Sequence, residues 1–228
     1  MLKEKRNDDS EREQKDGTLA RISTQRNLNE NITKENYMPN WCKNNLRIIS
    51  NGEKVLDLLE MVKNDEGEFT FTKFMPTPKE LDDTQSPTPD TMSEEEKKRL
   101  MDTYGATDWY TWRCKNWGCK WDAQESAFYK DGDDWIITFQ TPWGPPIEFL
   151  TEFSKKFSNI TFQLQFADEG YGQYPLGEAT IINGSVMYDG PEQDDARAET
   201  FAESVWDEEW VDDWTQLEGK EDDNDTEA

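Results

Sequence analysis

Three cysteines are the first residues to consider, because a thiolate can bind a metal ion or attack an electrophile. Cys114 and Cys119 lie five residues apart, and Cys42 lies far from both in the sequence. A structural zinc or an iron–sulfur cluster normally takes four ligands, and the chain has no histidine to complete a set. An odd number of cysteines without an export signal does not indicate a disulfide framework. We therefore predict free thiols, no metal site and no cofactor.

Catalytic side chains are the second possibility. The absence of histidine excludes Ser-His-Asp and Cys-His nucleophiles, so that only carboxylate, lysine or tyrosine chemistry is left. Asp122, beside Trp121, is the best single carboxylate, although we expect it to accept hydrogen bonds from the backbone in a tight turn. Gly170, Gly172 and Gly177 lack the spacing and the following helix of a phosphate-binding loop. We predict that the protein is not an enzyme.

The charge of the chain restricts its partners. The 228 residues include 50 Asp and Glu against 25 Lys and Arg, a formal net charge of −25. Such a charge repels nucleic acid and anionic membranes and attracts basic protein surfaces. No run approaches the roughly 18 consecutive apolar residues that span a bilayer, and the N-terminus lacks the apolar block of a signal peptide. We expect a cytoplasmic protein with a basic protein partner and no membrane contact, and we disfavour a nucleic-acid partner.

Composition divides the chain into three segments. Residues 1–37 carry eight basic and eight acidic residues with few bulky aliphatic ones, which predicts a disordered polar arm. Residues 189–228 carry seventeen acidic and two basic residues, a net charge of −15, and are predicted to form an acidic tail. Residues 38–188 keep a net charge of −10 and most of the aromatic residues. They are predicted to form one α+β domain.

Hydrophobic periodicity within residues 38–188 predicts the elements of that domain. Apolar residues at every second position indicate a strand with one buried face, and apolar residues three and four apart indicate an amphipathic helix. The predicted strands lie at 41–49, 69–74, 134–141, 160–167 and 179–182, and the predicted helices begin near Val55, Ser93 and Pro145. The order β-α-β, β-α-β predicts a ferredoxin-like split βαβ sandwich.

Three tryptophan-centred motifs resemble a known family. They are Met38-Pro39-Asn40-Trp41-Cys42 with Asn45, Leu46 and Ile48, then Asn116-Trp117-Gly118 with Lys120-Trp121-Asp122-Ala123, and finally Thr141-Pro142-Trp143-Gly144-Pro145-Pro146. In content and order the motifs are similar to the YubB-type ferredoxin-like domain family of bacteriophages and plasmids, over residues 38–188. Cys119 departs from the family pattern, which usually has Thr at this position.

This resemblance implies a fold and a set of residues, but no reaction. The family is largely uncharacterised, its name describes a topology without an iron–sulfur cluster, and it supplies no catalytic residue. The matching residues are therefore interpreted as structural or binding residues: Pro39, Asn40, Trp41, Cys42, Asn45, Asn116, Trp117, Gly118, Lys120, Trp121, Asp122, Trp143, Pro145 and Pro146. Because such proteins often begin at the equivalent of Met38, we also expect Met38 to be an internal or true start.

The acidic tail contains a further aromatic pattern. Trp206, Trp210 and Trp214 follow one another at four-residue spacing, which predicts one stripe along a short helix. A stripe of this kind either docks onto its own domain or binds a groove of a partner. Self-docking is favoured, because a free face of three tryptophans promotes aggregation, but binding to a partner stays open.

These features together favour a phage- or plasmid-type accessory protein that acts by protein–protein binding. One alternative is a DNA mimic, in which the carboxylates of residues 189–228 imitate phosphates and inhibit a DNA-binding defence enzyme. A second alternative is a nucleic-acid-binding module that stacks bases on its aromatic residues. The acidic charge of the domain argues against this second alternative.

Overall fold

The structure, a computed structural model, describes residues 39–50, 55–171, 173–192 and 194–219. Apart from Pro39, these residues belong to one compact unit. The arm predicted at 1–37, the start predicted at Met38 and the last nine residues of the tail lie outside the described residues. None of the described helices has the length and apolar character needed to cross a membrane.

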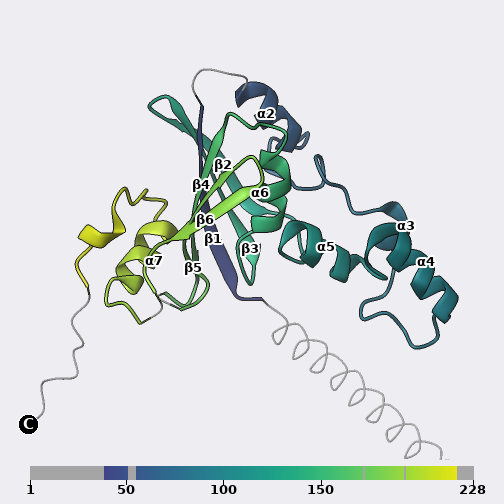
Figure 1. The fold of residues 1–228 in the computed structure, drawn as a ribbon. Helices are drawn as coiled ribbons and strands as arrows, with labels where there is room; N and C mark the ends of the chain where they lie inside the picture. The colour runs from purple at the N-terminus through teal and green to yellow at the C-terminus, as the bar shows by residue number, and fades with distance from the viewer. Residues whose placement is uncertain (1–38, 51–54, 172, 193, 220–228) are drawn as a thin grey trace, which may run out of the picture. The chain divides into compact units, whose positions relative to one another are not determined.

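A six-stranded antiparallel sheet organises the unit (Figure 1). The strands occur in the order β2-β3-β1-β4-β5-β6, and every neighbouring pair is antiparallel. Their bounds are β1 Trp41–Ile49, β2 Gln124–Asp131, β3 Asp134–Pro142, β4 Thr161–Asp168, β5 Leu176–Ile182 and β6 Ser185–Asp189. The first four strands follow the split βαβ order, because β1 separates β3 from β4 and β3 separates β1 from β2. The predicted ferredoxin-like α+β fold is confirmed.

Most helices lie between strands of this core, and α7 follows the last strand. Their bounds are α2 Val55–Val62, α3 Lys79–Asp82, α4 Glu94–Tyr104, α5 Trp109–Trp117, α6 Ile147–Ser154 and α7 Ala198–Trp206. A short 3-10 helix at Trp214–Gln216 follows α7. The helices predicted to begin near Val55, Ser93 and Pro145 correspond to α2, α4 and α6. Asp108 caps α5 by accepting a hydrogen bond from the Thr111 backbone N–H at 2.9 Å, a start signal that the tryptophans of this segment obscure.

Alternation along β1 gives the sheet two different faces. Cys42, Leu46 and Ile48 belong to the main hydrophobic core. Lys43 and Asn45, the residues between them, contact the C-terminal part of the chain instead. Because successive strand side chains point to opposite faces, β1 separates an apolar face from a polar one.

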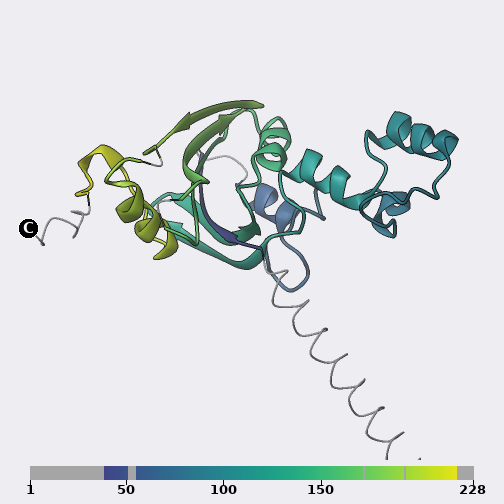
Figure 2. The ribbon, with the colours of Figure 1, turned by 90° about the horizontal axis from the view of Figure 1, so that it is seen from below.

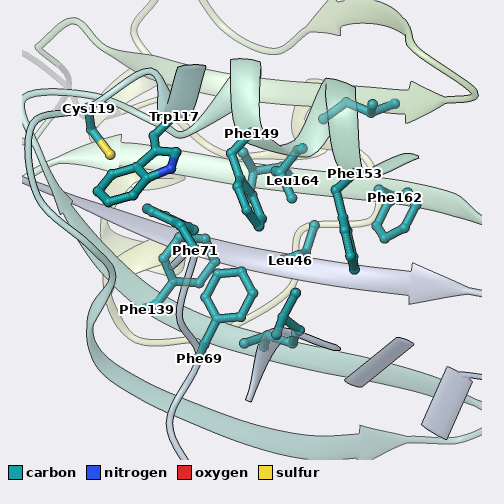
Figure 3. Close-up of a cluster of buried hydrophobic side chains, with 14 of the residues drawn as sticks. Leu46, Phe69, Phe71, Trp117, Cys119, Phe139, Phe149, Phe153, Phe162 and Leu164 are labelled. Atoms are coloured by element: carbon teal, nitrogen blue, oxygen red, sulfur yellow. The ribbon is translucent and has the colours of Figure 1, made fainter. Parts of the chain in front are cut away.

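The main core lies between the sheet and α6 and is rich in aromatic residues (Figure 3). Phe71 packs 4.5 Å from Phe149 between ring centroids, and Phe69 packs 4.7 Å from Phe139. Trp117 joins the same cluster at 5.7 Å from Phe71 and is 1% exposed. Burying an aromatic side chain of this size contributes about 1.5–3 kcal/mol each, so this cluster is the main source of stability.

The strand predicted at 69–74 is wrong. Phe69 forms only an isolated bridge with Lys63, and the backbone turns at Phe71, where the Phe74 and Met75 N–H groups donate to the Phe71 carbonyl. Both Phe69 and Phe71 are buried, so the alternating apolar pattern here reflects the burial of two side chains and not a strand paired within the sheet. The second strand of the fold is β2, whose sequence QESAFYKD is mostly exposed and charged. Such residues are typical of an edge strand and give no alternating apolar signal.

The far edge of the sheet is a hairpin that extends the four-stranded core. The apolar stretch predicted at 179–182 lies in β5, and Asn183-Gly184 connects it to β6. Both connecting residues have positive φ angles, 46° and 81°, as a two-residue hairpin turn of the primed type requires. The Asn-Gly pair could have predicted β6 from the sequence alone.

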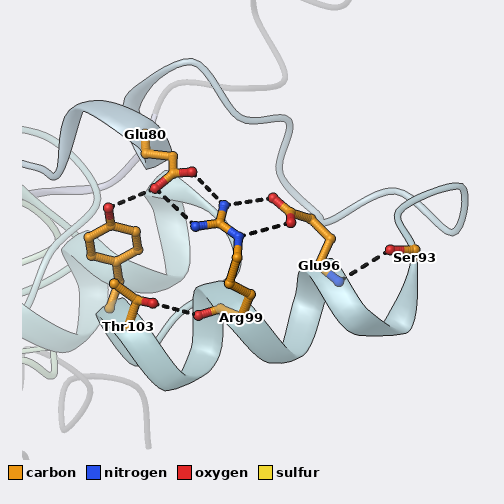
Figure 4. Close-up of polar contacts among 6 residues, drawn as sticks. Glu80, Ser93, Glu96, Arg99 and Thr103 are labelled. Atoms are coloured by element: carbon orange, nitrogen blue, oxygen red, sulfur yellow. Dashed lines mark hydrogen bonds and ion pairs between the residues drawn. The ribbon is translucent and has the colours of Figure 1, made fainter.

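The helices α3 and α4 are joined by an exposed polar network (Figure 4). Ser93 caps α4 by accepting a hydrogen bond from the Glu96 N–H at 3.2 Å. The Arg99 guanidinium, on α4, pairs with both Glu96 and Glu80, and the Tyr104 hydroxyl donates to Glu80 at 2.7 Å. The hydrogen bond from Arg99, which has the largest effect, and that from Tyr104 lower the pKa of the Glu80 carboxyl. The network holds α3 against α4.

The C-terminal residues pack on the polar face of the sheet. Figures 1 and 2 show α7 on the opposite side of the sheet from α6. A second, smaller cluster of buried residues forms there, made of Ala167, Leu176, Ala198, Phe201, Ala202, Val205 and Val211. Residues 198–217, named the C-terminal segment below, pack on the domain, in agreement with the self-docking favoured from the sequence, although the domain boundary predicted at residue 188 leaves them outside it.

The predicted stripe of three tryptophans on one helix is also wrong. Helix α7 ends at Trp206, Trp210 lies in irregular backbone, and Trp214 begins the 3-10 helix. The chain leaves helical geometry after Asp207, and Glu208 has a positive φ of 61°. Four-residue spacing predicts a common face only while a helix continues, and here the helix ends at Trp206.

Candidate binding site

The three tryptophan motifs, which are far apart in the sequence, meet at one end of the sheet. Antiparallel register places Trp41, at the start of β1, opposite Pro142 at the end of β3. Gln124, at the start of β2, lies opposite Gln140 of β3. The strands thus bring residues 40–42, 120–123 and 141–146 together, and we name this region the aromatic end.

Lys120 lies between two tryptophans at the aromatic end. Its Nζ is 3.8 Å from the ring centroid of Trp121 and 3.8 Å from that of Trp143. Trp41 extends the cluster, with its ring centroid 6.2 Å from that of Trp121. The Lys120 residue is only 6% exposed, and burial lowers the pKa of its ammonium group. In the part of the chain that the structure describes, no carboxylate forms an ion pair with Lys120, so the two indole rings stabilise its charge.

Trp143 is held in an unusual backbone conformation. Its φ of 69° lies in the left-handed region, which costs a residue with a side chain about 1 kcal/mol or more. The Trp143 N–H donates to the Asn40 carbonyl at 2.9 Å, and the Thr141 hydroxyl donates to the Gly144 carbonyl at 2.7 Å. These bonds fix the turn, and the Trp143 side chain stays 49% exposed. The structure thus presents a large apolar surface to solvent in one fixed orientation.

Exposed tyrosines surround this turn. Tyr174 is 77% exposed and precedes Pro175, whose ring would lie 3.8 Å from a Cβ placed on Gly144. Tyr188 of β6 is 65% exposed, and burial together with the nearby Glu148 and Tyr174 raises the pKa of its phenol. Sequence reasoning missed these tyrosines, although the run Tyr171-Gly-Gln-Tyr174-Pro is an aromatic loop signal.

Other residues of the second motif have structural roles. Trp117 donates its indole N–H to the Met75 carbonyl at 2.9 Å, and Asn116 donates to the Trp112 carbonyl at 2.8 Å. Gly118 ends α5 with a φ of 88°, and a Cβ at this position would lie 2.3 Å from a carboxylate oxygen of Glu148. These residues join α5 to the core and to α6.

The remaining motif residues also support the fold. Pro145 and Pro146 precede α6, and the Pro145 carbonyl accepts a hydrogen bond from the Ile147 N–H at 3.0 Å. Pro39 is buried. Asn45 lies on the polar face of the sheet, away from the aromatic end, and donates to the Val205 carbonyl at 2.9 Å.

Asp122 connects the second motif to the segment before α3. Its carboxylate accepts hydrogen bonds from the Phe71 N–H at 2.6 Å and from the hydroxyls of Thr70 and Thr72 at 2.6 and 2.7 Å. The Ala123 N–H donates a further bond at 2.9 Å. These donors occupy both carboxylate oxygens, so Asp122 fixes the turn at residues 70–72.

The thiols are in surroundings that disfavour the thiolate. Cys42 and Cys119 are buried, and this burial raises the pKa of each thiol well above its ordinary value. Burial also raises the pKa of the half-buried Cys114. A protonated thiol is a poor nucleophile and a poor metal ligand. Among the described residues, no cluster of three His, Cys, Asp or Glu side chains could hold a metal ion.

The tryptophans of the C-terminal segment contact three different places. Trp206 donates its indole N–H to the Asp168 carbonyl at 3.1 Å, next to the aromatic end. Trp210 lies over the Arg47 guanidinium, 4.3 Å from its Cζ to the ring centroid. Trp214 donates to the Asp189 carboxylate at 3.3 Å. The three side chains therefore do not form a common binding face.

A match to a family model supports the fold. Residues 116–209 match the family model described as the ferredoxin-like domain in Api92-like protein. The chain is also similar to the crystal structure of a protein api92 from Yersinia pseudotuberculosis, with 10% sequence identity and a TM-score of 0.36 over 68% of this chain and 99% of that chain. No curated protein matches the chain. The family-model match includes two of the three tryptophan motifs and α7.

Proposed function

We propose that this protein is a non-catalytic accessory protein of a bacteriophage or plasmid, which acts in the bacterial cytoplasm by binding another protein through the aromatic end. The observation that carries the proposal is the exposed aromatic surface formed by Trp143 and Tyr174 on a chain of net charge −25. Tryptophan and tyrosine are enriched at the centres of protein interfaces, where they supply large contact areas.

Preorganisation supports a binding role for this surface. The Lys120 ammonium contacts the ring of Trp143, and the Asn40 carbonyl accepts a hydrogen bond from its backbone N–H, so that both the side chain and the backbone are held in place. A side chain that is already ordered loses less conformational entropy when a partner covers it, so more of its contact energy appears as affinity. The left-handed φ of Trp143 is a cost to folding that a packing role alone does not explain, because the side chain is half exposed.

Charge favours a basic partner surface. Glu148 and Glu169 are exposed near the aromatic end, and the Glu169 N–H donates to the Trp41 carbonyl at 2.9 Å. The negative faces of exposed indole and phenol rings also attract the cationic side chains of arginine and lysine. A partner that presents arginine side chains therefore fits both features.

A non-catalytic role agrees with the state of the candidate catalytic groups. Burial favours the protonated thiol at Cys119, and the Asp122 carboxylate is occupied by donors from residues 70–72. DNA mimicry and nucleic-acid binding stay predictions from the sequence. Two of the carboxylates at 189–228 that such mimicry would use, Glu208 and Asp212, pair with cations of the chain itself.

The test is affinity capture of the full-length chain from bacterial cells, with quantitative mass spectrometry of the proteins retained. A Tyr174→Ser variant removes the most exposed ring without disturbing buried residues, and a Leu56→Ser variant at a 66% exposed site is the matched control. We expect a retained protein to fall about tenfold with Tyr174→Ser and to be unchanged with Leu56→Ser. Equal retention by the wild type and both variants would refute the use of the aromatic end.

A further inference from the structure

The polar face of the sheet, beneath the C-terminal segment, has the properties of a peptide-binding surface. Lys43, Asn45 and Arg47 of β1 face this side, and Gln165 of β4 lies opposite Asn45 in the register of the two strands. This surface is separate from the aromatic end and shares none of the residues proposed there to bind a partner. These four residues and Thr138 belong to the polar face of the sheet beneath the C-terminal segment.

Cations of the polar face recognise acidic and aromatic side chains. The Lys43 ammonium pairs with the Glu208 carboxylate at 2.5 Å. The Arg47 guanidinium pairs with Asp131 of β2 at 2.8 Å and also lies 3.8 Å from the Asp212 carboxylate of the segment. The same guanidinium stacks on the Trp210 ring. Arginine offers both a planar surface for an aromatic ring and donors for a carboxylate, so one side chain reads two features of the segment.

Amides of the polar face recognise the peptide backbone. The Gln165 side chain donates from Nε2 to the Val211 carbonyl at 2.6 Å and accepts from the Val211 N–H at 3.1 Å. The Asn45 amide donates to the Val205 carbonyl. A pair of bonds to one residue's N–H and C=O matches the spacing of these groups along a polypeptide backbone. The surface is therefore suited to a peptide.

The present fit leaves polar atoms without partners. Of the four buried side-chain atoms that find no hydrogen-bond partner within the described protein, three are Asn45 Oδ1, Arg47 Nε and Thr138 Oγ1. Asn45 lies directly opposite Thr138 in the register of β1 and β3, so these two residues are neighbours on this face. Leaving a buried polar atom unpaired costs about 1–3 kcal/mol. A peptide that paired these atoms would bind more tightly than the chain's own segment does.

We infer that the polar face is a binding site for an acidic, aromatic peptide segment of a partner protein, and that the C-terminal segment is its covalently attached, displaceable ligand. Attachment gives the segment an effective concentration of the order of millimolar, so it occupies the face when no partner is present. A partner segment with a tryptophan flanked by carboxylates competes for the same residues. Its binding releases the C-terminal segment.

The test uses the full-length chain and a fluorescein-labelled synthetic peptide with the sequence of residues 204–219 as the probe. A Trp210→Ala, Val211→Asp double variant weakens the attached segment and leaves the polar face intact. We expect the probe to bind this variant about tenfold more tightly than the wild type, because the internal competitor is weaker. Adding Arg47→Ala to the double variant reverses this gain by about tenfold, since it removes the stacking and the ion pair.

Arg99→Ala is the matched control, because it removes a cation that pairs with carboxylates far from the polar face. It leaves probe binding unchanged. Circular dichroism of each variant establishes that it is folded. Probe binding that is absent in the folded double variant, or that is the same with and without Arg47, would overturn the inference. Tighter binding of a labelled single-stranded oligonucleotide than of the peptide would assign the face to nucleic acid instead.

A measurement on the wild type keeps the inference testable if a variant does not fold. Hydrogen exchange of residues 198–217 is followed with and without an excess of the unlabelled peptide. Displacement predicts faster exchange in these residues when the peptide is present and no change in β4. Unchanged exchange at about millimolar peptide would refute displacement, because that concentration matches the effective concentration of the attached segment.

Discussion

Replacing Phe201 by alanine should detach the C-terminal segment without unfolding the rest of the unit. Phe201 is fully buried, and it belongs to the small cluster of seven buried residues on the polar side of the sheet. Truncating a buried phenylalanine to alanine costs about 3–5 kcal/mol. The main core around Phe69, Phe71 and Phe149 lies on the other side of the sheet and loses no contact.

The size of the effect follows from that energy. Because about 1.4 kcal/mol corresponds to a factor of ten, the equilibrium constant for local opening of residues 198–217 should rise by roughly two to three and a half orders of magnitude. Native-state hydrogen exchange measures this opening residue by residue. Amides of α7 should lose that much protection in the Phe201→Ala variant, and the slowest amides of β4 should keep theirs.

Phe153→Ala is the control for this experiment. Phe153 is 2% exposed and packs in the main core, 5.8 Å from Phe162 between ring centroids. Its truncation should lower protection in α7 and β4 together, since the whole unit is weakened. If Phe201→Ala lowered protection in β4 as strongly as in α7, the segment would be an inseparable part of the core, and the reasoning would be refuted.

Three further predictions concern single side chains. Gly118→Ala should lower the free energy of unfolding by about 1–3 kcal/mol in urea titrations, because φ is 88° and the new Cβ would clash with the Glu148 carboxylate. Asp122→Ala should lower it by about 2–4 kcal/mol, because the donors at residues 70–72 lose their acceptor. Glu178→Gln should raise stability at neutral pH and have little effect near pH 4, since burial raises the pKa of the Glu178 carboxyl.

The sign of the last prediction follows from proton linkage. A carboxyl whose pKa is higher in the folded state than in the unfolded state binds its proton more readily when folded. Its favourable contribution is present below the unfolded pKa and is lost as pH rises through the folded pKa. Glutamine keeps an acceptor for the Gln165 amide, which donates to Glu178 at 2.8 Å, without the buried charge. A stability difference between the wild type and the Glu178→Gln variant that did not grow between pH 4 and pH 7 would contradict this prediction. The other two predictions would be contradicted if the Gly118→Ala or the Asp122→Ala variant had the same free energy of unfolding as the wild type.

Local patterns in the sequence determined the central part of the fold. The alternation in residues 41–49 identified β1, and Ser93 three residues before Glu96 identified the start of α4. The proline pair at 145–146 identified the start of α6. These signals depend on contacts within a few residues, so they can be read without tertiary structure. The tryptophan motifs likewise indicated the ferredoxin-like fold, which the match over residues 116–209 supports.

Tertiary structure alone decided the aromatic end and the place of the C-terminal segment, whereas the second strand pairs locally with β3 through the Gly132-Asp133 turn. Strand β2 is an exposed edge whose pairing with β3 outweighs its weak apolar pattern, whereas Phe69 is buried without strand pairing. Lys120 meets Trp143 only because antiparallel register brings two distant segments together. Trp210 lies outside any helix, over the guanidinium of Arg47, which is far away in the sequence. At the aromatic end and in the C-terminal segment the contacts join residues that are distant in the chain, and no local sequence pattern contains that information.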